Sequence, residues 1–244
     1  MSLNVVNPFS QPLEIWSYRP ATQQEGLASM ANNGFPILNV RDQLITVISD
    51  MPQAASYLSV KHLSKKVSDH ITGALKSDLN FKNWRNAMPS KTPQNLINYQ
   101  NSYPPANLAL AASDVSQYGV ILPDEQILFH GGIWPLGQLE INTNRVFSTT
   151  FCPEIALNNA VHLGKAFCQG YIDLIVVKLK NVSTKAYVFN PSRGSKKHEK
   201  EVLFNSGATL KLINRQLASN NYPVGLNGTI QKHISVYIVN AELS

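Results

Sequence analysis

Tyr171-Ile172-Asp173-Leu174-Ile175-Val176-Val177-Lys178-Leu179 is the longest run of strand-forming residues in the chain. β-branched and aromatic residues at this density favour a β-strand. Shorter runs of the same kind lie on both sides of it, at Gln126 to His130, Val146 to Thr150, Ala186 to Phe189, Glu201 to Phe204, Ala208 to Ile213 and His233 to Val239. One predicted helix interrupts them, opening near Pro153 and burying Ala156, Ala160, Leu163 and Phe167.

The residues before Gly119 follow a helical period instead. Two amphipathic helices are predicted from apolar residues at Ile37, Val40, Leu44, Val47 and Ile48, and at Val60, Leu63, Val67, Ile71 and Ala74. Thr92 before Pro93 resembles an N-cap with proline at the first helical position, introducing a helix that carries Leu96, Ile97 and Tyr99. A further helix is expected after Pro104-Pro105, from Leu108 to Val115.

This order of elements predicts an α+β protein. Helices come first and strands follow with hairpin-length connections, which favours mainly antiparallel sheets over a parallel βαβ array. We expect an extended or loosely packed lead-in over residues 1–36, a helical lobe over 37–118 and a β-rich core over 119–244, with lobe and core forming one compact unit.

The composition indicates an ordinary globular protein. In a chain of 244 residues, 43% hydrophobic content is enough to form a core without metal ions or disulfide bonds. Cys152 and Cys168 lack the spacing of a metal or redox pair and are expected to be buried thiols. No signal peptide or membrane span is visible, so the chain is expected in the cytosol or exported by a route that the sequence does not show.

A net charge of +6 would attract an anionic dinucleotide, a nucleic acid or an acidic partner. The densest basic patch, Ser195-Lys196-Lys197-His198, is too short for a nucleic-acid arm, so nucleic-acid binding is not expected.

Two acids one residue apart, Glu199 and Glu201, lead directly into the apolar run Val202-Leu203-Phe204. Side chains alternate along a strand, so both carboxylates are expected to point the same way. Their mutual repulsion makes a purely structural role weak, although a solvated strand end is the plain alternative.

Two other segments end in polar groups. Val146-Phe147 is followed by the three hydroxyls Ser148, Thr149 and Thr150, which can satisfy turn amides or position a carboxylate. Ile127-Leu128-Phe129 is followed by His130 and two glycines, which allow a ligand to approach the backbone closely.

Taken in order, His130-Gly131, Ser148-Thr149-Thr150 and Glu199-Lys200-Glu201 resemble the motifs of the mono-ADP-ribosyltransferase superfamily, in particular its arginine-modifying bacterial toxins and effectors. The resemblance covers roughly residues 120 to 215. It departs from that branch at His130, where arginine is usual; Arg145 and Arg193 are both candidates to replace it. The fold implied is that of an ADP-ribosyltransferase, with two packed, mainly antiparallel β-sheets.

The resemblance implies NAD as co-substrate, no metal, and a target protein, expected to be a host protein, with an accessible arginine. Glu201 would stabilise the cationic ribose, Ser148 would hold Glu201, and Glu199 would face the arginine. His130, Gly131, Ser148, Thr149 and Thr150 would bind NAD, and the loop from Asn190 to His198 would recognise the target. No obligate partner is evident, and delivery by a non-classical or injected route into a host cytosol fits the family.

Three alternatives remain open at this stage. An NAD glycohydrolase would use water as acceptor, and a catalytically silent NAD-binding or interaction module would keep the fold alone. The segment from Leu128 to Trp134 also resembles the His-Gly-Gly motif of lipase-like hydrolases, but the Gly-x-Ser-x-Gly nucleophile motif is missing.

Overall fold

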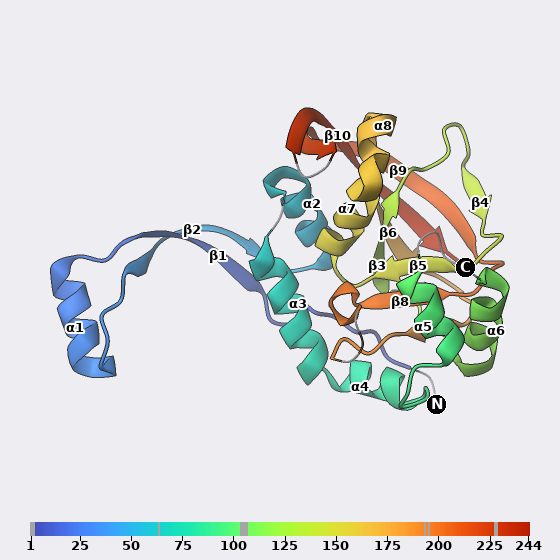
Figure 1. The fold of residues 1–244 in the computed structure, drawn as a ribbon, viewed down its shortest axis with the longest axis horizontal. Helices are drawn as coiled ribbons and strands as arrows, with labels where there is room; N and C mark the ends of the chain where they lie inside the picture. The colour runs from blue at the N-terminus through green and yellow to red at the C-terminus, as the bar shows by residue number, and fades with distance from the viewer. Residues whose placement is uncertain (1–2, 63, 103–106, 193, 195, 227–228) are drawn as a thin grey trace.

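The computed structural model describes residues 3–62, 64–102, 107–192, 194, 196–226 and 229–244. Leu63, Pro104-Pro105, Arg193 and Ser195, which the sequence analysis singled out, lie outside the described residues. Figure 1 shows a body that contains most of the chain and an arm that stands out from it. The predicted α+β class, with helices and two sheets, is confirmed.

The body is built on an eight-stranded sheet with the order β4-β9-β10-β6-β3-β5-β8-β7. Its neighbouring strands run antiparallel except for β10 and β6, which run parallel. The strands are β3 (Ile127–Gly132), β4 (Glu140–Asn142), β5 (Phe147–Thr150), β6 (Tyr171–Leu179), β7 (Ala186–Val188), β8 (Glu201–Phe204), β9 (Thr209–Leu226) and β10 (Thr229–Leu243). The strands β6 and β8 match the predicted runs to the residue, whereas β9 and β10 extend well beyond theirs.

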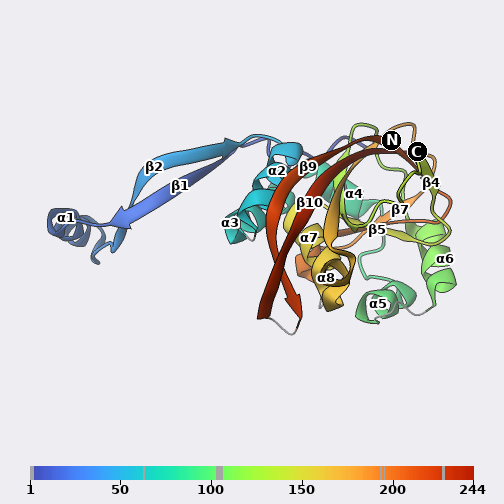
Figure 2. The same ribbon diagram turned by 90° about the horizontal axis from the view of Figure 1, so that it is seen from above.

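Helices surround this sheet. They are α2 (Met51–Lys61), α3 (Lys65–Ser77), α4 (Leu79–Asn86), α5 (Gln94–Asn101), α6 (Leu108–Tyr118), α7 (Pro153–Val161) and α8 (Lys165–Gln169). The helix predicted after Thr92 is present, with Pro93 rather than Thr92 at the N-cap. In both views α5 and α6 lie at the end of the body opposite the arm (Figures 1 and 2).

Helix α7 packs unusually close to β3. A Cβ atom added to Gly131 would lie 1.6 Å from the carbonyl oxygen of Ala156, so only glycine permits this approach. The two glycines after His130 therefore have a packing role in addition to any contact with a ligand. Gly132 makes room in turn for the ring of His130, because its added Cβ would lie 2.9 Å from Nε2 of that ring.

The arm consists of β1 (Leu13–Pro20), α1 (Gln23–Asn33) and β2 (Asn39–Ile48), and Figure 2 shows it projecting from one end of the body. The two strands pair antiparallel as a separate two-stranded sheet. The helix predicted from Ile37 to Ile48 is therefore wrong. Its apolar spacing does not reflect a buried face, since Leu44 and Val47 are 46% and 40% exposed and only Ile48 is buried.

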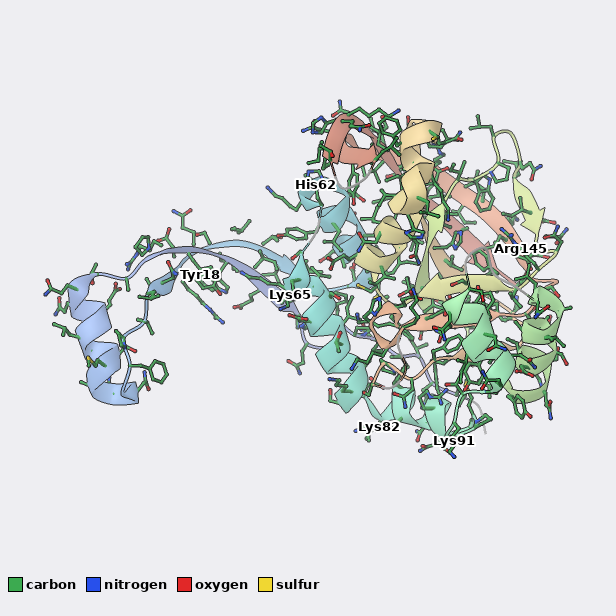
Figure 3. The ribbon with its side chains drawn as sticks, in the orientation of Figure 1. Tyr18, His62, Lys65, Lys82, Lys91 and Arg145 are labelled. Atoms are coloured by element: carbon green, nitrogen blue, oxygen red, sulfur yellow. The ribbon has the colours of Figure 1, made fainter. Side chains whose placement is uncertain are left out.

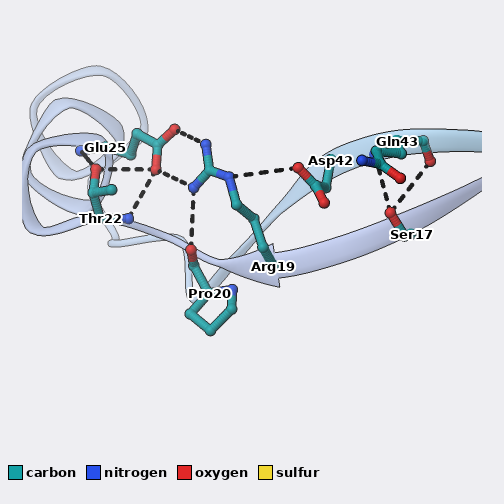
Figure 4. A network of polar contacts seen from close by, with 7 residues as sticks. All are labelled: Ser17, Arg19, Pro20, Thr22, Glu25, Asp42 and Gln43. Carbon is teal, nitrogen blue, oxygen red and sulfur yellow. Dashed lines mark hydrogen bonds and ion pairs between the residues drawn. The ribbon is translucent and has the colours of Figure 1, made fainter.

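Polar contacts inside the arm order its outer part (Figure 4). Thr22 and Glu25 form a capping box at the start of α1, and Glu25 also pairs with Arg19 at 2.8 Å. Ser17 bridges to the other strand by accepting from the amide of Gln43 and donating to its carbonyl oxygen. The outer part of the arm is thus held by its own contacts, whereas Ile15 and Ile48 at its base are buried in the core of the body.

Three further expectations need correction. The lead-in over residues 1–36 is not loosely packed throughout. Its residues Val6 and Phe9 are buried in the core of the body, and it contains the helix α1. The helix after Pro153 ends at Val161, and Leu163 has φ +54° and is 69% exposed rather than buried. Cys152 is buried as expected, but Cys168 lies on the surface in the short helix α8.

No helix in the described part of the chain is long and apolar enough to cross a bilayer.

Candidate active site

A cleft of about 440 Å³ is lined by residues from all three sequence motifs. Its lining comes from the end of α5, from β3 and β5, from α7, and from the turn that precedes β8. The motif residues that line it are His130, Gly131, Ser148, Thr149, Thr150, Glu199 and Glu201. This volume lies in the range of small-molecule sites, roughly 300–1,000 Å³.

Glu201 is the most perturbed acid in the cleft. Its side chain is buried, with Oε1 accepting a hydrogen bond from Ser148 Oγ at 2.6 Å and Oε2 accepting one from Gln100 Nε2 at 2.8 Å. Desolvation raises the pKa of Glu201 to about 7, while the two hydrogen bonds oppose that rise. The carboxylate is therefore fixed in one orientation and close to its ionisation point at neutral pH.

The three consecutive hydroxyls have different roles. Ser148 on β5 reaches Glu201 directly, because β5 and β8 are antiparallel neighbours. Thr149 Oγ1 donates to the carbonyl oxygen of Val202, and Thr150 Oγ1 donates to that of Glu199. Thr149 and Thr150 line the cleft, but their hydroxyls are engaged in holding the backbone around the two glutamates.

Glu199 is not on the strand, contrary to the alternation argument. It closes a single 3-10 turn, Lys197–Glu199, and the next residue, Lys200, has φ +49°. The strand begins only at Glu201. Both carboxylates still line the cleft, but a tight turn places Glu199 there, and it forms a 3.0 Å ion pair with Lys196.

Lys200, between the two glutamates, points away from solvent and anchors the turn. It is 5% exposed, and its Nζ donates to Ser68 Oγ of α3 and to the carbonyl oxygen of His198, both at 3.1 Å. The helical part of the chain thereby fixes the backbone on which Glu199 and Glu201 stand.

His130 contacts the backbone of the neighbouring strand, with its Nδ1 lying 2.7 Å from the carbonyl oxygen of Ser148. A carbonyl only accepts hydrogen bonds, so Nδ1 carries the proton in this arrangement. Burial lowers the pKa of His130, with smaller contributions from Lys165 and Arg145. The imidazole is accordingly neutral at pH 7 and does not supply the positive charge of an arginine at this position.

Several lining residues were not singled out as functional in the sequence. Tyr99, Gln100, Asn101 and Ser102 come from the end of α5 and the residue after it, and Asn158, Asn159, His162 and Lys165 come from α7 and the segment that follows. Burial first, and then the charge of Glu201, raise the pKa of Tyr99, which also hydrogen-bonds Ser148. Tyr99 appeared in the sequence only as part of an apolar helical face, and no local motif marks Gln100.

Positive charge near the cleft comes from lysine and arginine. Lys165 and Lys196 are among its lining residues. Arg145, labelled in Figure 3, is exposed in the segment before β5 and is close enough to lower the pKa of both His130 and Tyr99. Among the described residues, no three His, Cys, Asp or Glu side chains converge as metal ligands would.

The sequence matches no protein-family model and no curated protein. Among solved structures, the chain is similar to the ADP-ribosyltransferase Vis in complex with agmatine, at 14% identity over 77% of this chain and 90% of that one, with a TM-score of 0.45. Vis is a toxin from Vibrio splendidus. The enzymatic component C2-I of the Clostridium botulinum C2 toxin gives 14% identity over 77% of this chain and 46% of that one, with a TM-score of 0.36.

A third similar structure is Plx2a, an ADP-ribosyltransferase toxin from Paenibacillus larvae, at 10% identity over 80% of this chain and 96% of that one, with a TM-score of 0.34. These TM-scores all lie below 0.5.

Proposed function

We propose that this protein cleaves the bond between nicotinamide and ribose in NAD and transfers the ADP-ribose to an arginine side chain of a target protein. The observation that carries the proposal is the Glu201 carboxylate, which Ser148 and Gln100 hold in the cleft. As the glycosidic bond breaks, positive charge develops on the ribose ring, and a fixed carboxylate stabilises that charge more than it stabilises bound NAD.

The neighbouring residues support the two halves of the reaction. NAD would lie along β3 and β5, near His130, Gly131, Ser148, Thr149 and Thr150, with Lys165 beside its phosphates. The nicotinamide leaves with the electron pair of the broken bond, and a guanidinium nitrogen of the acceptor forms the new bond to the same ribose carbon. Glu199 would orient the guanidinium and accept its proton, since a carboxylate matches the planar fork of arginine.

The α-helical part of the chain belongs to this site in the proposal. Gln100 on α5 donates to Glu201, and Ser68 on α3 accepts from Lys200. With residues 37–48 assigned to the arm, α5 supplies part of the wall of the cleft, and α3 holds the turn before β8 from behind. We expect a chain without these helices to lose NAD cleavage.

One observation favours NAD hydrolysis as the alternative. The ion pair between Glu199 and Lys196 occupies the carboxylate that would receive arginine. If that pair persists when NAD is bound, water is the more accessible acceptor. A catalytically silent module is a third outcome.

The test is incubation of the purified chain with labelled NAD and a cell lysate, comparing the wild type with Glu201→Gln and Glu199→Gln. We expect protein labelling and nicotinamide release from the wild type. Glu201→Gln should reduce both by about a hundredfold or more, while circular dichroism confirms that it folds. Glu199→Gln should keep nicotinamide release and lose labelling of arginine.

Nicotinamide release without any labelling would replace the transferase by a glycohydrolase. No turnover of NAD under any condition would contradict both activities. Arginine labelling that survives Glu199→Gln would remove the role given to Glu199.

A further inference from the structure

A second cavity, of about 420 Å³, adjoins the cleft and is rich in lysine. It lies between the segment before α5, α5 itself and the described residues among 189–200, and we call it the lysine cavity. Lys91, Lys196, Lys197 and Lys200 line it, together with Ile97, Phe189 and neutral polar residues. No acidic side chain is among its described lining residues.

The lysine cavity begins where the acceptor side of the cleft ends. Gln100, Asn101 and Lys196 line both spaces, so the two spaces are neighbours and share part of their walls. Lys196 pairs with Glu199, the carboxylate that faces the acceptor in the proposed function. A molecule that presents a guanidinium to Glu199 would therefore have its neighbouring groups at the mouth of the lysine cavity.

The charge of the cavity is only partly satisfied within the protein. Lys196 has Glu199 as partner, and Lys200 is held by Ser68 and the carbonyl of His198, a neutral pair of acceptors. In the described structure neither Lys91 nor Lys197, both exposed, has a carboxylate partner. Figure 3 shows Lys91 at the lower edge of the body, in the segment between α4 and α5.

The apolar part of the lining strengthens the attraction of these lysines for anions. Phe189 is 5% exposed and Ile97 is half-buried, so one wall of the cavity is apolar and screens charges less than water does. Uncompensated positive charge beside such a wall attracts anions more strongly than a lysine on an open surface does.

We propose that the lysine cavity binds an acidic group of the acceptor, so that the protein selects an arginine with carboxylates close to it. This inference rests on the proposed function and names the class of acceptor for the same site. Glu199 would receive the guanidinium, and Lys91 and Lys197 would receive an aspartate or glutamate a few residues away. Such a pairing also excludes lysine-rich and arginine-rich segments, which the cavity would repel.

The test uses two synthetic peptides, each with one arginine flanked on both sides by three aspartates or, in the neutral control, three asparagines. Transfer of labelled ADP-ribose gives kcat/KM for each peptide, and fluorescence anisotropy gives its affinity without catalysis. We expect the wild type to prefer the acidic peptide by about tenfold or more in both measurements. In Lys91→Met/Lys197→Met, the ratio of the values for the acidic and the neutral peptide should fall close to one in both measurements.

The double variant Lys61→Met/Lys211→Met is the matched control, because it removes the same net charge at exposed positions outside both cavities. It should keep the preference of the wild type. Equal use and equal binding of the two peptides by the wild type would overturn the proposal, as would a preference that survives Lys91→Met/Lys197→Met or is lost equally in the control.

The two readouts keep this inference separate from the proposed function. Nicotinamide release without peptide tests NAD cleavage alone. If NAD is not cleaved, the anisotropy measurement still decides whether the cavity selects acidic peptides.

Discussion

At the scale of single residues, the hydrogen bond from Ser148 to Glu201 is expected to influence the pH range in which the proposed NAD cleavage occurs. This bond lowers the pKa of Glu201 against the larger effect of burial, which leaves it at about 7. Ser148→Ala should therefore raise that pKa further and move the rise of kcat with pH about one pH unit to the alkaline side. The measurement is kcat for nicotinamide release between pH 5 and pH 9.

Thr149→Val is the comparison for Ser148→Ala, because the hydroxyl of Thr149 contacts Val202 rather than Glu201. Its midpoint should stay at that of the wild type even if the variant is less stable. A profile for Ser148→Ala that rises at the same pH as the wild type would show that Ser148 does not act on Glu201.

Burial of Glu201 also predicts how stability depends on pH. Its pKa is about 7 when folded, against about 4.3 in an unfolded chain, so folding favours the protonated carboxyl. This contribution is fully present below about pH 4 and is lost as the pH rises through 7. Glu201→Gln cannot ionise, so we expect it to melt several degrees above the wild type at pH 8 and close to it at pH 4.5.

Differential scanning calorimetry of both proteins at the two pH values checks this prediction. A melting difference that is the same at pH 4.5 and pH 8 would mean that the buried charge of Glu201 does not limit stability. If Glu201→Gln is inactive and more stable than the wild type at pH 8, Glu201 lowers the stability of the protein in exchange for its function.

At the scale of elements, the contact between α7 and β3 depends on Gly131. A methyl group there would overlap the carbonyl of Ala156, so Gly131→Ala should force the helix from the strand and cost about 3 kcal/mol or more of the free energy of unfolding. Gly73→Ala in α3 is the matched change, because nothing lies within 4 Å of its added Cβ. That variant should be more stable than the wild type by about 0.5–1 kcal/mol.

Urea unfolding of the two alanine variants separates these effects. If Gly131→Ala were as stable as the wild type, α7 would not lie as close to β3 as the structure has it.

The sequence predicts those elements correctly whose burial in the structure gives rise to their pattern of apolar residues. Strand β6 was recognisable because most of its residues from Ile172 to Leu179 are buried, so strand formers occupy successive positions. Strand β2 does not match the helix that its sequence predicts. Most of its residues are exposed, so the helical spacing of its apolar residues does not reflect a buried helix face. Pairing with β1, whose partner residues lie 19 to 35 positions earlier, decides its structure and leaves no local signal.

The sequence singles out several residues that line the cleft, but it does not predict their geometry. Ser148, Glu199 and Glu201 stand in recognisable motifs, and the structure brings all three to one cleft. The left-handed conformation of Lys200, which breaks the alternation between the glutamates, depends on a contact with Ser68 that lies 132 positions away in the sequence. Gln100 could not be found for the same reason, because an amide on a helix acquires its role only through packing.

At the scale of the whole molecule, the arm and the body should be separable. Between Ser17 and Gln43 the only buried side chain described is Ser29, which bonds to Phe35 within the arm. Replacing residues 17–43 with an Asn-Gly turn between Trp16 and Leu44 should leave nicotinamide release and the melting temperature close to those of the wild type. Kinetic and calorimetric measurements on the shortened chain check this.

The same excision combined with Ile48→Ala serves as a contrast, since Ile48 is 1% exposed and belongs to the core of the body. It should lower the melting temperature by several degrees. Loss of NAD cleavage on excision alone would place the arm in the catalytic unit.

The order of the strands has a consequence for biosynthesis. Residues 229–243 form β10, which lies between β9 and β6 and runs parallel to β6. While a ribosome is still making that segment, β6 has an open edge on one side, and that edge belongs to one of the most apolar strands of the protein. Unpaired edges of this kind attract other chains. The nascent protein thus passes through a stage in which the residues of the cleft are already synthesised but the edge of β6 is unpaired, and we expect a chaperone to bind at that stage.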